Sequence, residues 1–92
     1  MIEIVELVPV LDLIAAPNLL NNLLEKRGHD LEIEAGHVRR IGAQCLQVLL
    51  SAKAAWSEDG FNFSVKDYSE EFVEYLRIMG LAPEDLNSHI KI

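Results

Sequence analysis

The chain has 92 residues, half of them apolar, and a net charge of −7 from 15 acidic and 8 basic residues. This length fits one small domain over residues 1–92, with 83–92 as a candidate flexible tail. An acidic chain repels phosphate backbones, so we expect no nucleic-acid partner. The single cysteine cannot form an internal disulfide, and no stretch resembles a signal peptide or a membrane span. We therefore expect a cytoplasmic protein without membrane insertion.

The first part of the chain alternates extended and helical patterns. Ile2–Val8 mixes β-branched residues with glutamates, which predicts an edge strand with Ile2 and Ile4 on its apolar face. Val10–Leu13 is expected to resume this extended structure briefly. Leucines at helical spacing then predict a helix over Pro17–Arg27. The leucines of its apolar face are Leu19, Leu20, Leu23 and Leu24.

The middle of the chain predicts a strand, Leu31–Ala35, followed by a basic turn and a long helix, Ala43–Ser57. Apolar residues cover more than half of this helix, which predicts burial on two sides, against a sheet and against another molecule. Trp56 is a candidate exposed contact, so the sequence permits a homodimer. The polar residues of the helix form one narrow stripe, made of Gln44, Gln47, Ser51 and Glu58.

The last part predicts a strand over Phe61–Val65, an N-cap at Ser69 and a third helix that stops at Gly80. A further turn is expected over Pro83–Leu86. The alternation of strands and helices implies parallel neighbours joined by right-handed crossovers. We therefore predict a small α/β domain with a mainly parallel or mixed short sheet and helices mostly on one face. The buried face of the third helix is predicted as Phe72, Val73, Leu76 and Met79.

The segment Val38-Arg-Arg-Ile-Gly-Ala-Gln-Cys-Leu-Gln-Val-Leu-Leu, with the later segments 56–65 and 68–81, resembles a STAS domain. This is the family of bacterial anti-anti-sigma factors and of the sulfate-transporter cytoplasmic domain. Its pattern is a strand, a turn of the form I-D-S-S-G-L-G-V-L, a helix, a strand and a closing helix. Ile41 takes the first position of that turn and Leu46 its leucine. The resemblance implies a STAS-like fold and a regulatory protein-interaction module, not an enzyme.

Three positions depart from the family pattern. Its aspartate falls on Gly42, and its two serines fall on Ala43 and Gln44. The serine phosphorylated in a typical anti-anti-sigma factor corresponds to Gln44, which has no hydroxyl, so the resemblance implies that phosphorylation does not switch this site. The form G-A-Q-C-L-Q-V-L-L-S-A, with a downstream tryptophan, resembles small STAS proteins of alphaproteobacterial chemotaxis operons. That narrower likeness implies a chemotaxis histidine kinase as the partner in signal transduction.

Several alternatives remain open. The chain could be a STAS subunit of an ABC lipid-transport complex, attached to its ATPase, or an unphosphorylatable anti-anti-sigma factor bound to an anti-sigma kinase. A thiol enzyme would use Cys45, because a helix N-terminus lowers a thiol pKa, although a buried structural cysteine is the simpler interpretation. The three histidines lack metal-site spacing and no phosphate-binding glycine loop is present, so we expect no metal and no cofactor.

The expected partner-binding site is the loop Gly36–Gly42 and the first turns of the helix that follows. Arg39 and Arg40 lie beside a helix N-terminus in an acidic chain. They either balance nearby carboxylates or dock on an acidic patch of a partner, where arginine is common. The partner-binding candidates are His37, Arg39, Arg40, Gly42, Gln44 and Gln47.

Overall fold

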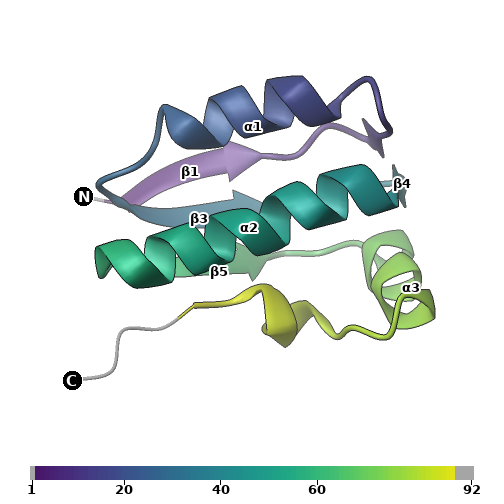
Figure 1. Ribbon diagram of the computed structural model, residues 1–92. Helices are drawn as coiled ribbons and strands as arrows, with labels where there is room; N and C mark the ends of the chain where they lie inside the picture. Colours follow the sequence, from purple (N-terminus) through teal and green to yellow (C-terminus); the bar gives the residue numbers. More distant parts are fainter. Residues whose placement is uncertain (1, 89–92) are drawn as a thin grey trace.

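The computed structural model describes residues 2–88 and confirms the predicted alternation of strands and helices (Figure 1). The bounds of several elements differ from the expected ones by two to three residues. In chain order, the elements are β1 (Ile2–Glu6), β2 (Val10–Leu11), α1 (Ala16–Leu24), β3 (Asp30–Glu34), β4 (Arg40–Ile41), α2 (Ala43–Asp59), β5 (Phe63–Lys66), α3 (Glu70–Ile78) and a 3-10 turn, η1 (Pro83–Leu86).

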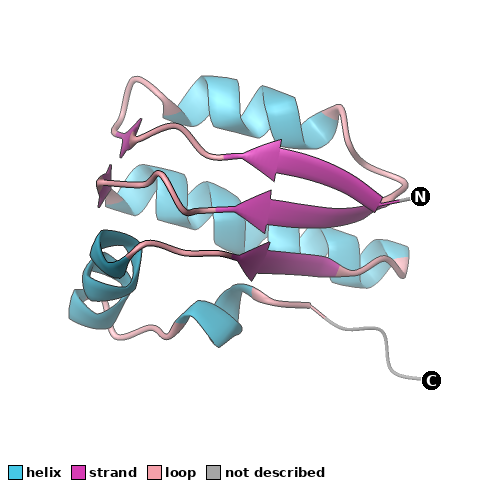
Figure 2. Cartoon of the chain, turned by 180° about the vertical axis from the view of Figure 1, so that it is seen from behind, coloured by secondary structure: helices cyan, strands magenta, loops and turns pink. Residues whose placement is uncertain are grey.

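The main sheet has three parallel strands in the order β1-β3-β5. A second, two-stranded parallel pair, β2 with β4, lies at the end where the main strands finish (Figure 1). Helices α1 and α2 cover one face of the main sheet. Seen from behind, the other face carries no helix within residues 2–88 (Figure 2). The predicted α/β class, with a parallel sheet and helices mostly on one face, is therefore confirmed.

The core lies between the sheet and the two helices, where every second strand residue points. Leu31, Ile33 and Ala35 of the β3 segment are each at most 1 % exposed, as their alternation predicts. They pack with Phe63 and Val65 from β5, which the parallel register places beside them. This apolar layer fixes which way each strand faces and therefore which loops meet at its end.

Trp56 is buried, and its prediction as an exposed contact was wrong. Its side chain is 2 % exposed, its indole Nε1 donates to the His29 carbonyl at 2.7 Å, and its ring packs against Phe63 with centroids 5.7 Å apart. The wide apolar face of α2 packs on α1, β5 and η1 of the same chain. The chain itself therefore supplies both sides of the burial that the helix pattern predicts.

The edge position of β1 is confirmed, but its apolar face was predicted wrongly. Val5 and Leu7 are buried, whereas Ile2 and Ile4 are 53 % and 55 % exposed. Pairing with β3 in parallel register turns the odd-numbered residues of β1 towards the helices. The two isoleucines consequently lie on the sheet face that no described helix covers.

Helix α1 is shorter than predicted and ends at Leu24. Glu25 N still donates to the carbonyl four residues earlier, but the N–H groups of Lys26 and Arg27 donate to carbonyls three residues earlier, which tightens the chain into a turn. Leu20 and Leu24 are 44 % and 50 % exposed, so only half of the predicted apolar face is buried. A helix at the edge of a three-stranded sheet has too little sheet beneath it to bury a wider stripe.

The end of the described chain is held against β5. Ser69 caps α3 as predicted, with its Oγ accepting from Phe72 N at 3.1 Å, although Met79 is not buried as expected. Beyond η1, Asn87 Oδ1 accepts from Val65 N at 2.8 Å, and Ser88 exchanges two backbone hydrogen bonds with Phe63. The candidate tail is therefore structured as far as residue 88. Residues 89–92, which include the third histidine, lie outside the described residues.

Candidate partner-binding site

The loop from Gly36 to Gly42 leaves β3 at the end of the sheet and returns to begin α2. A Cβ on Gly36 would lie 2.8 Å from the Asp67 carbonyl oxygen, a separation that real Cβ atoms essentially never show. The Ala35 carbonyl accepts from both Val38 N and Ser69 N, which ties the loop to the start of α3. Only glycine therefore allows the chain after β3 to pass so close to the chain after β5.

Backbone hydrogen bonds fix this loop against β2. The N–H groups of Arg39 and Arg40 both donate to the Pro9 carbonyl, at 2.8 and 3.2 Å, and Gly42 N donates to the Leu11 carbonyl at 2.9 Å. The backbone under the two arginines is thus held by a neighbouring segment, while both side chains are exposed. An arginine on a fixed backbone loses less freedom when it binds a partner than one on a mobile loop.

The side chains of Arg39 and Arg40 have no hydrogen-bond acceptor or ion-pair partner within residues 2–88, which sets them apart from the other lysines and arginines there. Glu32, one of the carboxylates proposed to balance them, instead pairs with Lys66 at 2.8 Å and thereby raises the pKa of that lysine. Balance by local charges is therefore not seen. The remaining basic side chains of the described part have acceptors: Lys26 with Glu3, Arg27 with Asp59, Arg77 with Glu74, and Lys53 with the Asp85 carbonyl.

Three of the six predicted residues, Arg40, Gly42 and Gln44, line one shallow hollow of about 430 Å³ at the N-terminus of α2. The other predicted residues lie around it or apart from it. Arg39 precedes Arg40 in the loop, and Gln47 is exposed one helical turn beyond Gln44. His37 lies apart from the hollow, since its imidazole Nε2 is 3.9 Å from the Glu6 carboxylate on β1. The other residues that line the hollow are Leu11, Asp12, Leu13, Ile41, Ala43 and Tyr75.

Sequence reasoning missed two strongly exposed large apolar side chains, Leu13 and Ile14, which are 68 % and 82 % exposed. They lie in the turn between β2 and α1, where Ala15 N donates to both the carbonyl and the side-chain Oδ1 of Asp12. This tight turn projects the two side chains into solvent beside the hollow. Leu13 was instead expected in the extended segment Val10–Leu13, and Ile14, which lies between that segment and the predicted helix, was the available signal.

Cys45 is completely buried, and its thiol donates to the Asp12 carbonyl at 3.3 Å. Burial, and secondarily the negative charge of Asp12, raise the pKa of this thiol. This environment agrees with the buried structural cysteine that was the simpler interpretation of the sequence, and it does not support an activated thiol. A protonated, enclosed thiol suits the core. Within residues 2–88 no group of three metal-binding side chains is placed to hold an ion.

The chain matches one known protein family over most of its length. The model of a family described as "Mlab, STAS domain" matches residues 3–86, a span that includes all the strands that end at the site and both loops that line it. No curated protein and no solved structure matches the chain. Within residues 2–88, no helix is both long and apolar enough to cross a membrane. STAS domains act as regulatory modules through contacts with other proteins. By this match over most of its length, the chain belongs to the STAS-domain family.

Proposed function

We propose that the chain is a non-catalytic regulatory module that binds a cytoplasmic signalling protein through one end of the fold. We call this end the docking surface. Its members are Leu13, Ile14, Arg39, Arg40, Gln44 and Gln47. The observation that carries the proposal is that two arginines with no side-chain acceptor within residues 2–88 lie near two strongly exposed apolar side chains. Apolar anchors with neighbouring arginines are the composition of binding hot spots.

The composition of the docking surface indicates the chemistry of its partner. An apolar recess on the partner would complement Ile14, and carboxylates at the rim of that recess would complement Arg39 and Arg40. Gln44 adds a primary amide, which donates and accepts hydrogen bonds at the edge of the hollow. Because the family's phosphoacceptor serine corresponds to Gln44, we propose that binding here is not controlled by phosphorylation of this position.

The partner that we propose first is a chemotaxis histidine kinase. Support comes from the resemblance of the segment 42–52 to STAS proteins of chemotaxis operons. The alternative partners for the same docking surface are an ATPase of an ABC lipid-transport complex and an anti-sigma kinase. The thiol-enzyme alternative is not supported, since Cys45, the only cysteine of the sequence, is buried and has a raised pKa.

The test is an affinity pull-down from a bacterial lysate with the tagged full chain, followed by mass spectrometry of the retained proteins. The variants Ile14→Ser and Arg39→Glu/Arg40→Glu change the docking surface without removing a buried side chain. We expect each to lower recovery of the partner by at least about tenfold, since hot-spot truncations cost more than about 1–2 kcal/mol.

Matched controls lie at the other end of α1. Leu24→Ser removes another exposed apolar side chain, 50 % exposed against 82 % for Ile14, and Lys26→Glu reverses a charge. Both should retain the partner, and circular dichroism should show all four variants folded. Retention by the two docking-surface variants as well would show that the surface assignment is wrong. Recovery of an ABC ATPase or an anti-sigma kinase instead of a chemotaxis kinase would keep the docking surface and replace the proposed partner.

A further inference from the structure

Within residues 2–88, one edge of the main sheet is covered by the chain itself and the other edge is open. The outer edge of β5 is covered by the chain itself, through the backbone of Ser88 and the side chain of Asn87. The outer edge of β1 has no such cover within residues 2–88. Leu7 N donates inwards to the Glu34 carbonyl at 2.9 Å, and backbone N–H groups alternate in direction along a strand. The N–H and C=O groups of Ile4 and Glu6 therefore point outwards, to the bare edge.

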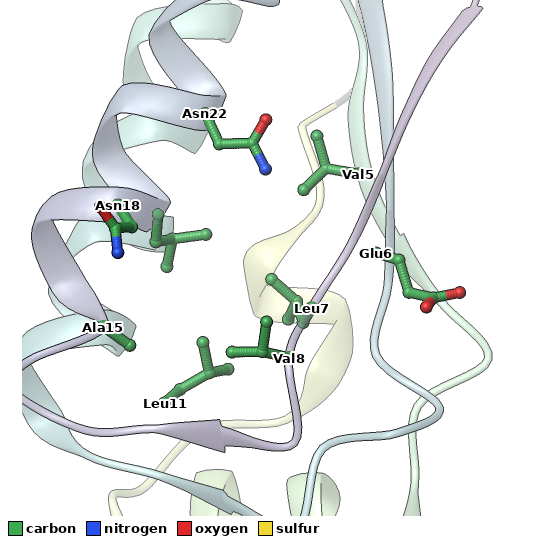
Figure 3. Close-up of a pocket in the computed structure, with 9 residues that line it drawn as sticks. Val5, Glu6, Leu7, Val8, Leu11, Ala15, Asn18 and Asn22 are labelled. Carbon is green, nitrogen blue, oxygen red and sulfur yellow. The ribbon is translucent and has the colours of Figure 1, made fainter.

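A groove runs beside this bare edge, between β1 and α1 (Figure 3). It encloses about 130 Å³ over an apolar floor and opens between the two elements. In the close-up, Asn22 of α1 and Val5 of β1 point towards one another across the groove, whereas Glu6 points away from it. The residues that line this β1–α1 groove are Val5, Glu6, Leu7, Val8, Leu11, Ala15, Asn18, Leu19 and Asn22.

The groove and the edge together have the geometry for addition of a strand. In an added strand, one set of alternate side chains would enter the groove on the helix side, and the other set would lie over the uncovered sheet face. Besides Ile2 and Ile4, that face carries four acidic residues and one lysine, Lys66, which already pairs with Glu32. The acidic residues are Glu6, Asp30, Glu32 and Glu34. Apolar side chains suit the first environment and basic side chains suit the second.

We propose that an extended segment of a partner protein, with alternating apolar and basic residues, adds to the free edge of β1. Its backbone pairs with Ile4 and Glu6, its apolar side chains enter the β1–α1 groove, and its basic side chains face the acidic sheet surface. This site is separate from the docking surface. An added strand would also cover the outward N–H and C=O groups of Ile4 and Glu6. Such an open strand edge otherwise favours aggregation.

A second copy of the chain suits this edge poorly. The open sheet face beside β1 carries Glu6, Glu32 and Glu34, so pairing of two β1 strands would join two acidic faces. Like charges across a strand pair are destabilising, and each copy carries a net charge of −7. A basic segment instead removes the repulsion and gains attraction.

The probe is a blocked synthetic peptide of about six residues, the usual length of a strand, that alternates leucine and lysine. It is titrated into the isotopically labelled full chain and followed by amide NMR. We expect saturable shifts concentrated at Ile4, Glu6 and Val8. A scrambled peptide with the leucines and lysines in separate blocks should bind at least about tenfold more weakly, since only the alternating order serves both faces.

Backbone methylation of the peptide tests the strand pairing itself. In an antiparallel addition the lysine nitrogens donate to β1, and in a parallel addition the leucine nitrogens do. We expect methylation of one alternating set to lower affinity by at least about tenfold and methylation of the other set to leave it within about twofold. Equal effects of the two sets would refute strand addition.

Variants of the protein complete the test. Asn18→Trp fills the groove from α1 and should weaken the peptide, whereas Asn21→Trp, on the exposed side of the same helix, should not. Arg39→Gln/Arg40→Gln should also leave peptide binding unchanged, which separates this proposal from the docking surface. No saturable binding of the alternating peptide, or a dimer in sedimentation equilibrium that protects the β1 amides, would overturn the proposal.

Discussion

The burial of Trp56 can be tested by the substitution Trp56→Phe, which keeps an aromatic ring and removes the indole N–H. The lost hydrogen bond ends on the partly buried carbonyl of His29, 2.7 Å from Nε1 in the native chain, and costs about 1 kcal/mol. The smaller ring leaves a gap at a site that is 2 % exposed, which costs a further 1–2 kcal/mol or so. We expect a total loss of about 2–3 kcal/mol in the free energy of unfolding.

Urea denaturation followed by circular dichroism measures this loss, because the variant has no tryptophan to report by fluorescence. With an m-value of about 1–1.5 kcal/mol per molar urea for a chain of this size, the midpoint should fall by about 2 M. Tyr68→Phe is the matched control, since that ring is 42 % exposed, and its midpoint should not move. If Trp56→Phe unfolds at the same urea concentration as the native chain, the indole is not seated in the core and the dimer interpretation of Trp56 returns.

Three further predictions concern the segments that support the docking surface. Gly36→Ala places a Cβ 2.8 Å from the Asp67 carbonyl and should destabilise the fold by about 1–3 kcal/mol in urea denaturation; an unchanged midpoint would contradict the close approach. Ser69→Ala removes both the cap of Phe72 N and the hydroxyl donor to the Val38 carbonyl, so it should cost more, by about 1 kcal/mol, than Ser69→Asp, which keeps only the cap. The pKa of the Cys45 thiol is raised in the folded chain, so its contribution to stability is complete below the ordinary value of 9.0 and is lost as pH rises through the raised pKa. At pH 8, iodoacetamide should therefore alkylate the native chain far more slowly than the urea-unfolded chain, and equal rates would show an accessible thiolate.

Much of the fold follows from local patterns in the sequence. The segment Leu31–Ala35 has one strong alternation, which packing confirms, and Ser69 carries a capping signal that its hydroxyl satisfies. Strand β1 is different, because both of its faces carry β-branched residues and glutamates interrupt the alternation at Glu3 and Glu6. Periodicity cannot choose between two such faces, so the register with β3 decides.

The candidate site was also only partly predictable, because tertiary contacts decide the state of its side chains. The basic loop is visible in the sequence, but the state of Arg39 and Arg40 depends on which cation pairs with Glu32. Glu32 lies on β3, and Lys66 on the neighbouring strand β5 forms the ion pair with it. The role of Leu13 depends on a turn that projects it from the fold. Such facts arise from tertiary contacts, and no local propensity contains them.

The hollow beside the docking surface and the β1–α1 groove meet at the short strand β2. Leu11 lines both the groove and the hollow, and its strand pairs with Arg40 and Ile41. A side chain that enters the groove must therefore press on the same strand that positions the arginines. By linkage, any effect of the leucine–lysine peptide on partner affinity must be matched by an equal effect of the partner on peptide affinity. We expect a coupling of severalfold that Leu11→Ala reduces, and two affinities that stay independent in the native chain would show that β2 holds the surfaces apart.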